Sequence, residues 1–366
     1  MRLFIAFAAF IVFASARGVQ ELPIKIPDIP LIPIPDIPLP VDIKDLNLDK
    51  IKQTFGDFRK NYGKKYKNSG DESKAQGIFG DNLKKIIQLN MKHKGKSIKF
   101  GLNRFSDLTD SEFASKILMK EKPSSEFLTN FETYNFTSTK FQAQPSFDWR
   151  DTPNVVGPVR FQDTCGCCWA FTTAALVQSA YGIKNQEIIQ PSEQQLCDCG
   201  LQNAKPGCNG GNVGVALTYV QNNGVSLDDS YYPYTAARAM VGGVCEDSDK
   251  PNNIKIASYQ SLHPSNAEKI QSALVSTGPI AVAYKVGSSF RHYKSGVFDS
   301  NDCDDAATLI GWHAVAVVGY GDDGGVPYWI AKNSWDTTFG DQGYFRFIRG
   351  TDLCQFESAD AFSATI

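Results

Sequence analysis

Gln162-Asp-Thr-Cys-Gly-Cys-Cys-Trp-Ala-Phe171 places three cysteines directly ahead of a helical pattern that continues to Lys184. Two short stretches further along the chain stand out beside it, Trp312-His313-Ala314-Val315 and Lys332-Asn333-Ser334-Trp335. Only a thiolate attacks, so chemistry at Cys168 needs a partner that lowers the pKa of the thiol. A helix N-terminus and the imidazole of His313 can both do this. The three stretches therefore supply a candidate nucleophile, a base and an orienting amide.

The chain beyond residue 143 divides into two halves of different character. Residues 169–184 and 213–221 have helical periodicity, whereas glycine-punctuated strand patterns cover 280–286, 314–320, 327–332 and 344–348. We therefore expect an α+β fold with a helical lobe and a β lobe. Cys168 belongs to the first lobe and His313 to the second, so the reaction site should lie in the cleft between them.

The composition describes an ordinary globular protein with ample material for a core. Of the 366 residues, 42% are hydrophobic and 21% are charged, and the formal net charge is −2. This balance carries no sign of a nucleic-acid partner.

Residues 1–16 indicate a signal peptide. They combine Arg2, an apolar stretch from Leu3 to Phe13 and the small residues Ala14-Ser15-Ala16, which suit cleavage. A membrane anchor is the alternative, but about 11 apolar residues are too few for the roughly 30 Å hydrocarbon core. All nine cysteines lie after the signal peptide, in a part of the chain that would enter the oxidising secretory pathway, where disulfides form and persist. The odd number leaves at least one thiol unpaired. We expect the secretory pathway, with a lysosomal or extracellular destination.

Residues 17–43 form a proline-rich segment. An eight-residue period is visible in it, IPDIPLIP from Ile26 and IPDIPLPV from Ile34. Such a segment favours polyproline II and builds no core of its own, so a stiff spacer is the main hypothesis and a docking site the alternative.

Residues 44–142 form a separate helical region of opposite charge to the rest. Helical spacing relates Ile51, Phe55, Phe58, Tyr62 and Tyr66, and a second helical pattern spans residues 72–94. Residues 44–122 hold 19 Lys plus Arg against 10 Asp plus Glu, a balance of +9, whereas residues 143–366 hold 14 against 23, a balance of −9. Complementary potentials favour docking of one segment on the other, and acid would weaken that attraction. A chance asymmetry of solvated surfaces is the alternative.

These motifs together resemble a papain-like cysteine peptidase precursor, close to the cathepsin L group, from about residue 50 to the end. That family carries a Cys-Gly-(Ser/Ala)-Cys-(Trp/Tyr) signature with a histidine and an asparagine downstream. Here His313 lies 145 residues after Cys168 and Asn333 lies 165 after it. The resemblance implies a papain-like two-lobed domain at residues 143–366, with a helical left lobe and a β-barrel-like right lobe, preceded by a helical inhibitory propeptide.

The resemblance also implies the role of each catalytic residue. Cys168 matches the nucleophile, and His313 matches the partner that holds the thiolate and later protonates the leaving amine. Asn333 matches the residue that orients the imidazole, and Gln162 matches the side chain that donates to the oxyanion. Trp335 matches the indole that shields the Asn–His hydrogen bond. The implied activity is that of a cysteine endopeptidase, made as an inactive precursor, which cleaves peptide bonds through an acyl-enzyme.

The cysteines allow more than one interpretation. Cys165-Gly-Cys-Cys168 also fits the C-x-x-C of a thiol oxidoreductase and, with Cys197 and Cys199, a metal cluster. The family resemblance instead implies three disulfides: Cys165 with Cys208, Cys199 with Cys245, and Cys303 with Cys354. We further expect Cys167 and Cys197 to form a fourth, because each sits next to a family cysteine on neighbouring segments. On this interpretation no metal or cofactor is needed.

The propeptide carries family marks of its own. Gly101-Leu-Asn103-Arg-Phe105-Ser-Asp107 matches the G-x-N-x-F-x-D motif in full. The upstream helix motif is partial, because Asp71 and Ala75 stand where Glu and Arg are usual. We expect a lost salt bridge and looser helices there. The resemblance implies that the propeptide lies backwards through the cleft as an intramolecular inhibitor, is removed at low pH, and leaves a mature enzyme that begins near residues 142–146.

Substrate preference is also implied by matching residues. Gly210 and Gly211 match glycines that let a substrate backbone pair with the cleft edge. The pocket for the side chain two residues before the scissile bond would be small-walled and mostly apolar, which favours a bulky hydrophobic residue and, with Ala359 at its floor, argues against arginine. Its matched members are Asn212, Val213, Ala283, Gly311, Ala314 and Ala359. No occluding insertion is visible, so we expect an endopeptidase.

Several residues depart from the family pattern. Asp163 and Asp336 stand where glycine is usual, Trp312 replaces an Asp or Asn, and Phe339 replaces a tryptophan; together they predict an altered rate or pH dependence. Asn135-Phe-Thr137 is a glycosylation sequon. We expect a monomer that binds polypeptide substrates. A catalytically silent protein of the same fold and a redox or metal-binding protein are the competing hypotheses.

Overall fold

The computed structural model describes residues 37–40, 42–123, 132–137, 144–201, 207–227, 231–235, 244, 245 and 254–366. The expected signal peptide and most of the proline-rich segment lie outside the described residues. The last part of that segment, residues 37–40, packs Ile37 and Leu39 beside Tyr62, Phe100 and Leu102. This end of the proline-rich segment is therefore in contact with the helical region that follows it.

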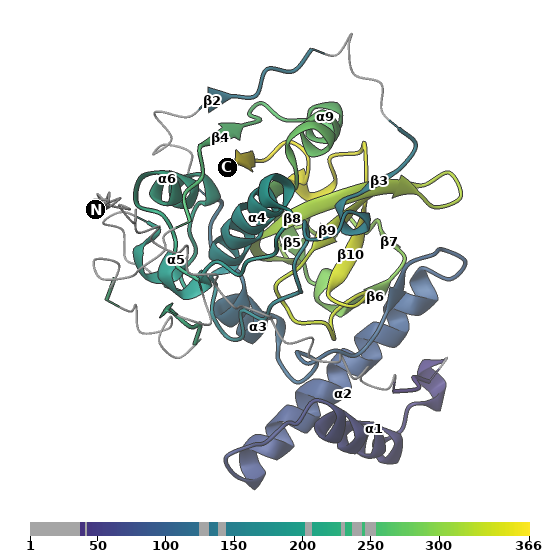
Figure 1. The fold of residues 1–366 in the computed structure, drawn as a ribbon. Helices are drawn as coiled ribbons and strands as arrows, with labels where there is room; N and C mark the ends of the chain where they lie inside the picture. The colour runs from purple at the N-terminus through teal and green to yellow at the C-terminus, as the bar shows by residue number, and fades with distance from the viewer. Residues whose placement is uncertain are drawn as a thin grey trace, which may run out of the picture. The chain divides into compact units, whose positions relative to one another are not determined.

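The helical region begins with a pair of crossed helices (Figure 1). After the short helix η1 (Ile43–Asp45) come α1 (Leu48–Asn61) and α2 (Ser69–Lys92). The side chains of Asn47 and Asn68 cap their N-termini by accepting backbone N–H groups. α1 ends at Asn61, so the expected helix, which extended to Tyr66, was predicted too long. Buried aromatic rings of the two helices pack together, with Phe58 and Phe79 ring centroids 4.9 Å apart.

The partial helix motif does not leave the helices unjoined. Asp71 and Ala75 do not form the usual ion pair, but the Arg59 guanidinium of α1 pairs with the Glu72 carboxylate of α2. Asn82 donates from its side chain to the carbonyls of Ser106 and Leu108, at 2.8 Å each. The expected loosening is therefore offset by the Arg59–Glu72 ion pair, which the motif comparison did not include.

The chain then crosses the rest of the protein as a strand and a short helix. β1 (Lys99–Phe100) pairs antiparallel with β6 (Tyr293–Ser295). α3 (Asp110–Ile117) starts with a capping box, in which the Thr109 hydroxyl and the Glu112 carboxylate each bond the other's backbone N–H. β2 (Glu132–Thr133) later pairs parallel with β4 (Ser258–Ser261).

The helical lobe is built around α4 (Cys168–Asn185), with α5 (Glu193–Cys199) and α6 (Val213–Asn223) packed against it. Figure 1 shows α4 passing in front of β5 and β8. The helix α4 is buried along most of its length, because it lies between α5 and α6 on one side and the sheet on the other. The expected helices at 169–184 and 213–221 thus correspond to α4 and α6.

The β lobe is one curved sheet. Its strand order is β2-β4-β11-β5-β8-β9-β10-β7, and β3 (Phe147–Asp148) pairs with β8 off this path. All but the parallel pairs β2–β4 and β10–β7 are antiparallel, and α9 (Ala267–Thr277) packs on β11, β8 and β5. The remaining elements are η3 (Trp149–Asp151), β5 (Ile280–Gly287), η4 (Phe290–His292), β7 (Val297–Phe298), β8 (Leu309–Asp322), β9 (Pro327–Lys332), β10 (Tyr344–Ile348), η5 (Leu353–Gln355) and β11 (Ala361–Thr365).

Two hydrophobic cores hold these layers together. One lies in the helical lobe around Trp169 and Leu196. The other runs without a break from the rings of α1 and α2 through Phe113 into the β lobe around Trp335. Docking of the helical region therefore extends the β-lobe core. Among the described residues, no helix has the length and apolar character needed to cross a membrane.

Candidate active site

Cys168 is the first residue of α4, which places its sulfur at the positive end of the helix dipole. Its Sγ accepts a hydrogen bond of 3.4 Å from the backbone N–H of Ala314 on β8. This contact spans the two lobes, because α4 belongs to the helical lobe and β8 to the sheet. The side chain is fully buried. The nucleophile candidate thus lies where the sequence pattern expected it, at the junction of the lobes.

His313 is held in one orientation by its neighbours. Its Nε2 lies 2.7 Å from Oδ1 of Asn333, which itself accepts the backbone N–H of Ser334 at 2.8 Å. The indole of Trp335 covers the imidazole, with ring centroids 4.5 Å apart. Both rings are fully buried. The Nδ1 atom of His313 has no hydrogen-bond partner among the described residues, so it is the nitrogen left to exchange a proton.

Gln162 is fixed so that its amide nitrogen faces the cleft. Its Oε1 accepts the Ser334 hydroxyl at 2.6 Å, and its Nε2 donates to the carbonyls of Cys165 at 2.6 Å and Ile117 at 2.8 Å. Ile117 is the last residue of α3, in the segment expected to be the propeptide. A backbone carbonyl of that segment therefore occupies the donor that the resemblance assigns to an oxyanion.

Burial keeps both reacting groups neutral in this form. It raises the pKa of Cys168 to about 12, an effect that hydrogen bonds from backbone N–H groups only partly offset. It lowers the pKa of His313 to about 4, partly offset by Asn333. A thiolate–imidazolium pair is thus disfavoured while the cleft is covered.

The covering segment pairs with the cleft edge as a strand would. Met119 and Trp312 exchange both backbone hydrogen bonds, at 2.9 Å each. Gly210 and Gly311 have φ values of 103° and 154°, and a Cβ at either position would lie 3.2 Å or less from atoms of Met119. Glycine is thus required at these two positions for the backbone to come this close.

A small pocket lies further along the same path, beneath Pro123. Its wall includes Asn212, Val213, Ala283 and Ala314, which the resemblance assigned to this pocket, together with Gly211, Ala281, Val282, Asp360 and Phe362. Asn212 also caps α6, because its Oδ1 accepts the backbone N–H of Gly214 at 2.8 Å. Among the described residues that line it, Asp360 is present, whereas Ala359 and Gly311, two expected members, are not. Ala359 is buried in the same hydrophobic cluster as Val213, Ala314 and Phe362, so its expected place at the floor stays a prediction.

The cysteines fall into three disulfides and three thiols. Cys165–Cys208, Cys199–Cys245 and Cys303–Cys354 are bonded, as the resemblance implied. The fourth expected disulfide is absent: Cys167 and Cys197 are both buried thiols, in hydrogen-bond contact with each other. Cys167 Sγ also lies 3.3 Å from the Tyr234 hydroxyl. Bonding of Cys165 removes the C-x-x-C dithiol, and the described residues hold no cluster suited to a metal ion.

Two aspartates that replace the usual glycines keep the glycine-like backbone. Asp163 and Asp336 have φ values of 51° and 61°, in the left-handed region where glycine is normally favoured. Asp336 in addition forms an ion pair of 2.6 Å with Arg104, inside the Gly101–Asp107 motif. The second departure therefore provides a partner for the segment that covers the cleft.

Arg291 is a contact residue that the sequence analysis missed. It is 1% exposed, and its guanidinium donates to the Leu108 carbonyl at 2.6 Å and pairs with Asp110 at 3.0 Å. Its own carbonyl accepts the Asn103 side chain at 2.6 Å. Charge counting could not identify it, because here the cation lies on the acidic domain and the carboxylate on the basic segment.

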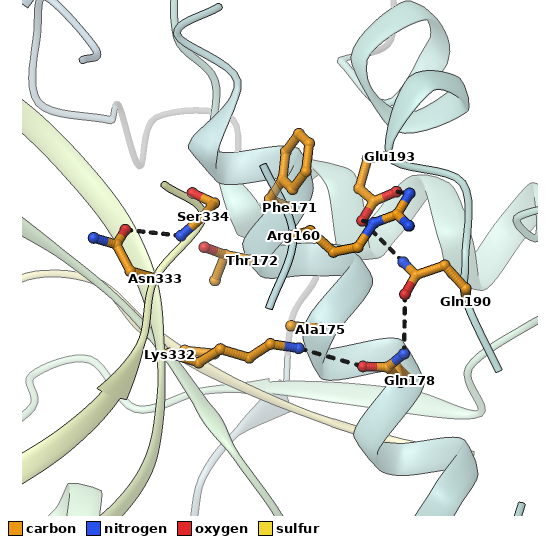
Figure 2. A pocket seen from close by; sticks show the side chains of 11 residues that line it. Arg160, Phe171, Thr172, Ala175, Gln178, Gln190, Glu193, Lys332, Asn333 and Ser334 are labelled. Atoms are coloured by element: carbon orange, nitrogen blue, oxygen red, sulfur yellow. Dashed lines mark hydrogen bonds and ion pairs between the residues drawn. The ribbon is translucent and has the colours of Figure 1, made fainter. Parts of the chain in front are cut away.

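A polar cavity of about 20 Å³ lies between the lobes beside Asn333 and Ser334. Figure 2 shows Lys332 reaching from β9 to Gln178 of α4, with Arg160 and Glu193 facing each other nearby. The Lys332 Nζ to Gln178 Oε1 distance is 3.5 Å, and burial lowers the pKa of Lys332 to about 8. The cavity has room for about one water molecule. It is too small for a peptide, and lining side chains such as Lys332 and Gln178 make polar contacts between the lobes.

Comparison with known proteins agrees with this geometry. Residues 143–364 match the papain family cysteine protease model, and residues 55–113 match the cathepsin propeptide inhibitor domain (I29). The cathepsin L-like proteinase of Phaedon cochleariae is 34% identical over 357 residues, covering 96% of this chain and 95% of that protein.

Solved precursor structures have the same fold. The recombinant stem bromelain precursor superposes with a TM-score of 0.76 at 32% identity, covering 87% of this chain and 99% of that one. Digestive procathepsin L 3 from the larval midgut of Tenebrio molitor has a TM-score of 0.74 at 28% identity, covering 88% and 100%. The chain belongs to the papain family of cysteine proteases. It is a propeptide-bearing precursor of a cysteine endopeptidase, and the predicted α+β, papain-like fold is confirmed.

Proposed function

We propose that the protein is an acid-activated endopeptidase in which Cys168 attacks the scissile carbonyl carbon. The observation that carries this is the set Cys168, His313, Asn333 and Gln162 converging from both lobes, with a backbone carbonyl already bound to Gln162 Nε2. Gln162 Nε2 and the Cys168 backbone N–H stabilise the oxyanion. His313 protonates the leaving amine, then takes a proton from water, which hydrolyses the acyl-enzyme to the acid product.

The direction of the propeptide supports its role as an inhibitor rather than a substrate. It runs from Ile117 at Gln162 to Pro123 at the pocket. A substrate with a side chain in that pocket and its scissile carbonyl at Gln162 runs the opposite way. The Val213, Ala314 and Phe362 side of the pocket is apolar, so it favours a bulky hydrophobic residue two before the scissile bond.

Mapping of the cleaved products tests the proposed activity. Acid-treated precursor is incubated with an unfolded protein, and the new termini are identified by mass spectrometry. We expect internal cuts with hydrophobic residues enriched at that second position. Removal of residues only from chain ends, or intact protein at every acidity, would contradict the proposal.

Gln162→Ala tests the oxyanion role. Removal of one such donor lowers kcat by about 10²- to 10³-fold. The measurement is kcat on a fluorogenic peptide after titration of active sites, with Gln186→Ala as the control, because Gln186 ends α4 at the surface. A loss of kcat of less than about threefold would show that Gln162 takes no part in the reaction.

Acid activation has a candidate sensor in His93, at the C-terminus of α2. The ring is 5% exposed and its Nδ1 lies 3.6 Å from Asp299 Oδ1, while Lys96 pairs with the other carboxylate oxygen at 2.6 Å. Burial lowers the pKa of His93, with Asp299 and Asp302 opposing this and Lys96 and Lys92 adding to it. The released propeptide therefore takes up a proton that the docked one resists, so docking weakens as the pH falls below the ordinary histidine value of about 6.5.

His93→Phe should shift activation to lower pH. Uptake of one proton by His93 on release changes the docking equilibrium constant by up to about tenfold per pH unit. Phenylalanine cannot take up this proton. The measurement is the fraction of precursor processed against pH. Met91→Phe is the matched control, since Met91 lies exposed at the same end of α2. Coincident profiles for the two variants would remove His93 from the mechanism.

The destination and form of the enzyme are also proposals. The expected signal peptide and the three disulfides support the secretory pathway, with lysosomal or extracellular use. Asn135 lies exposed within residues 132–137, which supports glycosylation there. We propose a monomer that acts on polypeptides.

A further inference from the structure

Asp360 lies in the wall of the substrate pocket. It lies directly before β11 and lines the same cavity as Val213, Ala314 and Phe362. The residue is 9% exposed, and its Oδ2 has no hydrogen-bond partner among the described residues. A buried carboxylate is costly unless a donor or a cation approaches it. The pocket wall therefore contains an acidic residue with one carboxylate oxygen that accepts no hydrogen bond from the described residues.

Two basic side chains lie near the Asp360 carboxylate. His263 Nδ1 lies 3.9 Å from Asp360 Oδ1. The ammonium of Lys122, in the propeptide, acts electrostatically on the carboxylate and lies 5.9 Å from the ring centroid of Trp312. Burial raises the pKa of Asp360, and Lys122 and His263 partly offset this.

The propeptide therefore places a cation at this pocket before any substrate does. Pro123 lines the pocket and its neighbour Lys122 supplies the charge. When the propeptide leaves, the carboxylate loses that cation and regains access from the cleft. A substrate side chain with an apolar stem and a cationic tip satisfies both the walls and the carboxylate, because lysine and arginine bury their stems while directing the charge to a partner.

We propose that Asp360 makes this pocket accept arginine or lysine two residues before the scissile bond, in addition to hydrophobic residues. The proposal rests on the proposed peptidase function and refines its substrate class. It differs from the expectation drawn from Ala359, which argued against arginine. The stem of the basic side chain packs against Val213 and Ala314, and its tip bonds Asp360.

Three peptides that differ only at that position test the proposal. They carry leucine, arginine, or citrulline, the uncharged analogue of arginine. With acid-matured wild-type enzyme, kcat/KM for arginine should exceed that for citrulline by about 10- to 100-fold, the value of one charge-assisted hydrogen bond. In Asp360→Asn this ratio should approach one. Asp323→Asn is the control, because it removes a carboxylate that pairs with Arg346 at the surface, and it should keep the wild-type ratio.

The ratio should also depend on pH. Protonation of Asp360 abolishes the preference for arginine over citrulline, so the ratio falls as the pH is lowered and stays flat in Asp360→Asn. Equal cleavage of the arginine and citrulline peptides by wild-type enzyme across the pH range would overturn the proposal. An Asp360→Asn enzyme with an unchanged ratio would do the same. Failure to cleave even the leucine peptide would instead overturn the peptidase function on which the proposal rests.

Discussion

Cys168→Ala should abolish peptidase activity and stop the precursor from processing itself in acid. Loss of the nucleophile in a catalytic unit of this type lowers kcat by more than about 10⁴-fold, because the remaining groups act only through it. Alanine is a good helix residue and the rest of α4 keeps its contacts with both lobes, so the variant should fold. Conversion of Cys168→Ala precursor by added wild-type enzyme would show that it remains a substrate.

The neighbouring thiol provides the matched control for this experiment. Cys167 is also buried, but it lies before α4, toward Cys197 and Tyr234. Cys167→Ser should keep most of the activity, since serine is a good residue at a helix N-cap. An epoxide inhibitor should label Cys168 alone. Activity in the Cys168→Ala variant, or loss of activity in the Cys167→Ser variant, would show that Cys168 is not the nucleophile.

Arg291→Leu should open the precursor at neutral pH. The change removes the bond to the Leu108 carbonyl and the ion pair with Asp110, and it leaves the Asn103 contact with the backbone. Loss of charge-assisted bonds of this kind costs about 2–3 kcal/mol, which raises the open fraction by roughly 30- to 150-fold. The measurement is the rate at which an epoxide inhibitor labels Cys168 in unprocessed precursor.

Arg346→Leu is the control for this second prediction. Arg346 likewise makes an ion pair, 3.3 Å to Asp323, and it lies over the ring of Tyr328. Both partners belong to the peptidase domain. Its labelling rate should equal that of wild type. If the two variants react at the same rate, Arg291 does not hold the propeptide in place.

Periodicity predicted the elements that have one clear buried face or a continuous apolar run. The pattern at 169–184 and the strand patterns at 314–320 and 327–332 lie within α4, β8 and β9. The helix α5 went unpredicted because its sequence, Glu-Gln-Gln-Leu-Cys-Asp-Cys, is polar, yet every residue in it is buried. Its polar groups bond inside the protein, as Gln194 does to Asp198 at 2.9 Å. Burial of this kind leaves no amphipathic signal.

The catalytic residues were predictable for a different reason. Each sits in a short local motif, so its identity does not depend on knowing the tertiary contacts. The pocket was harder, because Ala359 and Asp360 are neighbours and only the path of the backbone decides which one lines it. That path follows a turn in which Asp352, Cys354 and Gln355 all have φ between 50° and 60°. No propensity predicts three left-handed residues without glycine.

The buried state of Cys168 in the precursor also bears on how long an unused enzyme keeps its capacity to react. Oxidants and electrophiles consume thiolates that they can reach. A sulfur with a pKa of about 12 and no solvent contact offers them neither the charge nor the path. The segment that blocks the cleft thus also protects the sulfur from oxidation and alkylation. Cys168 becomes open to such damage only when the propeptide is released and the enzyme becomes active.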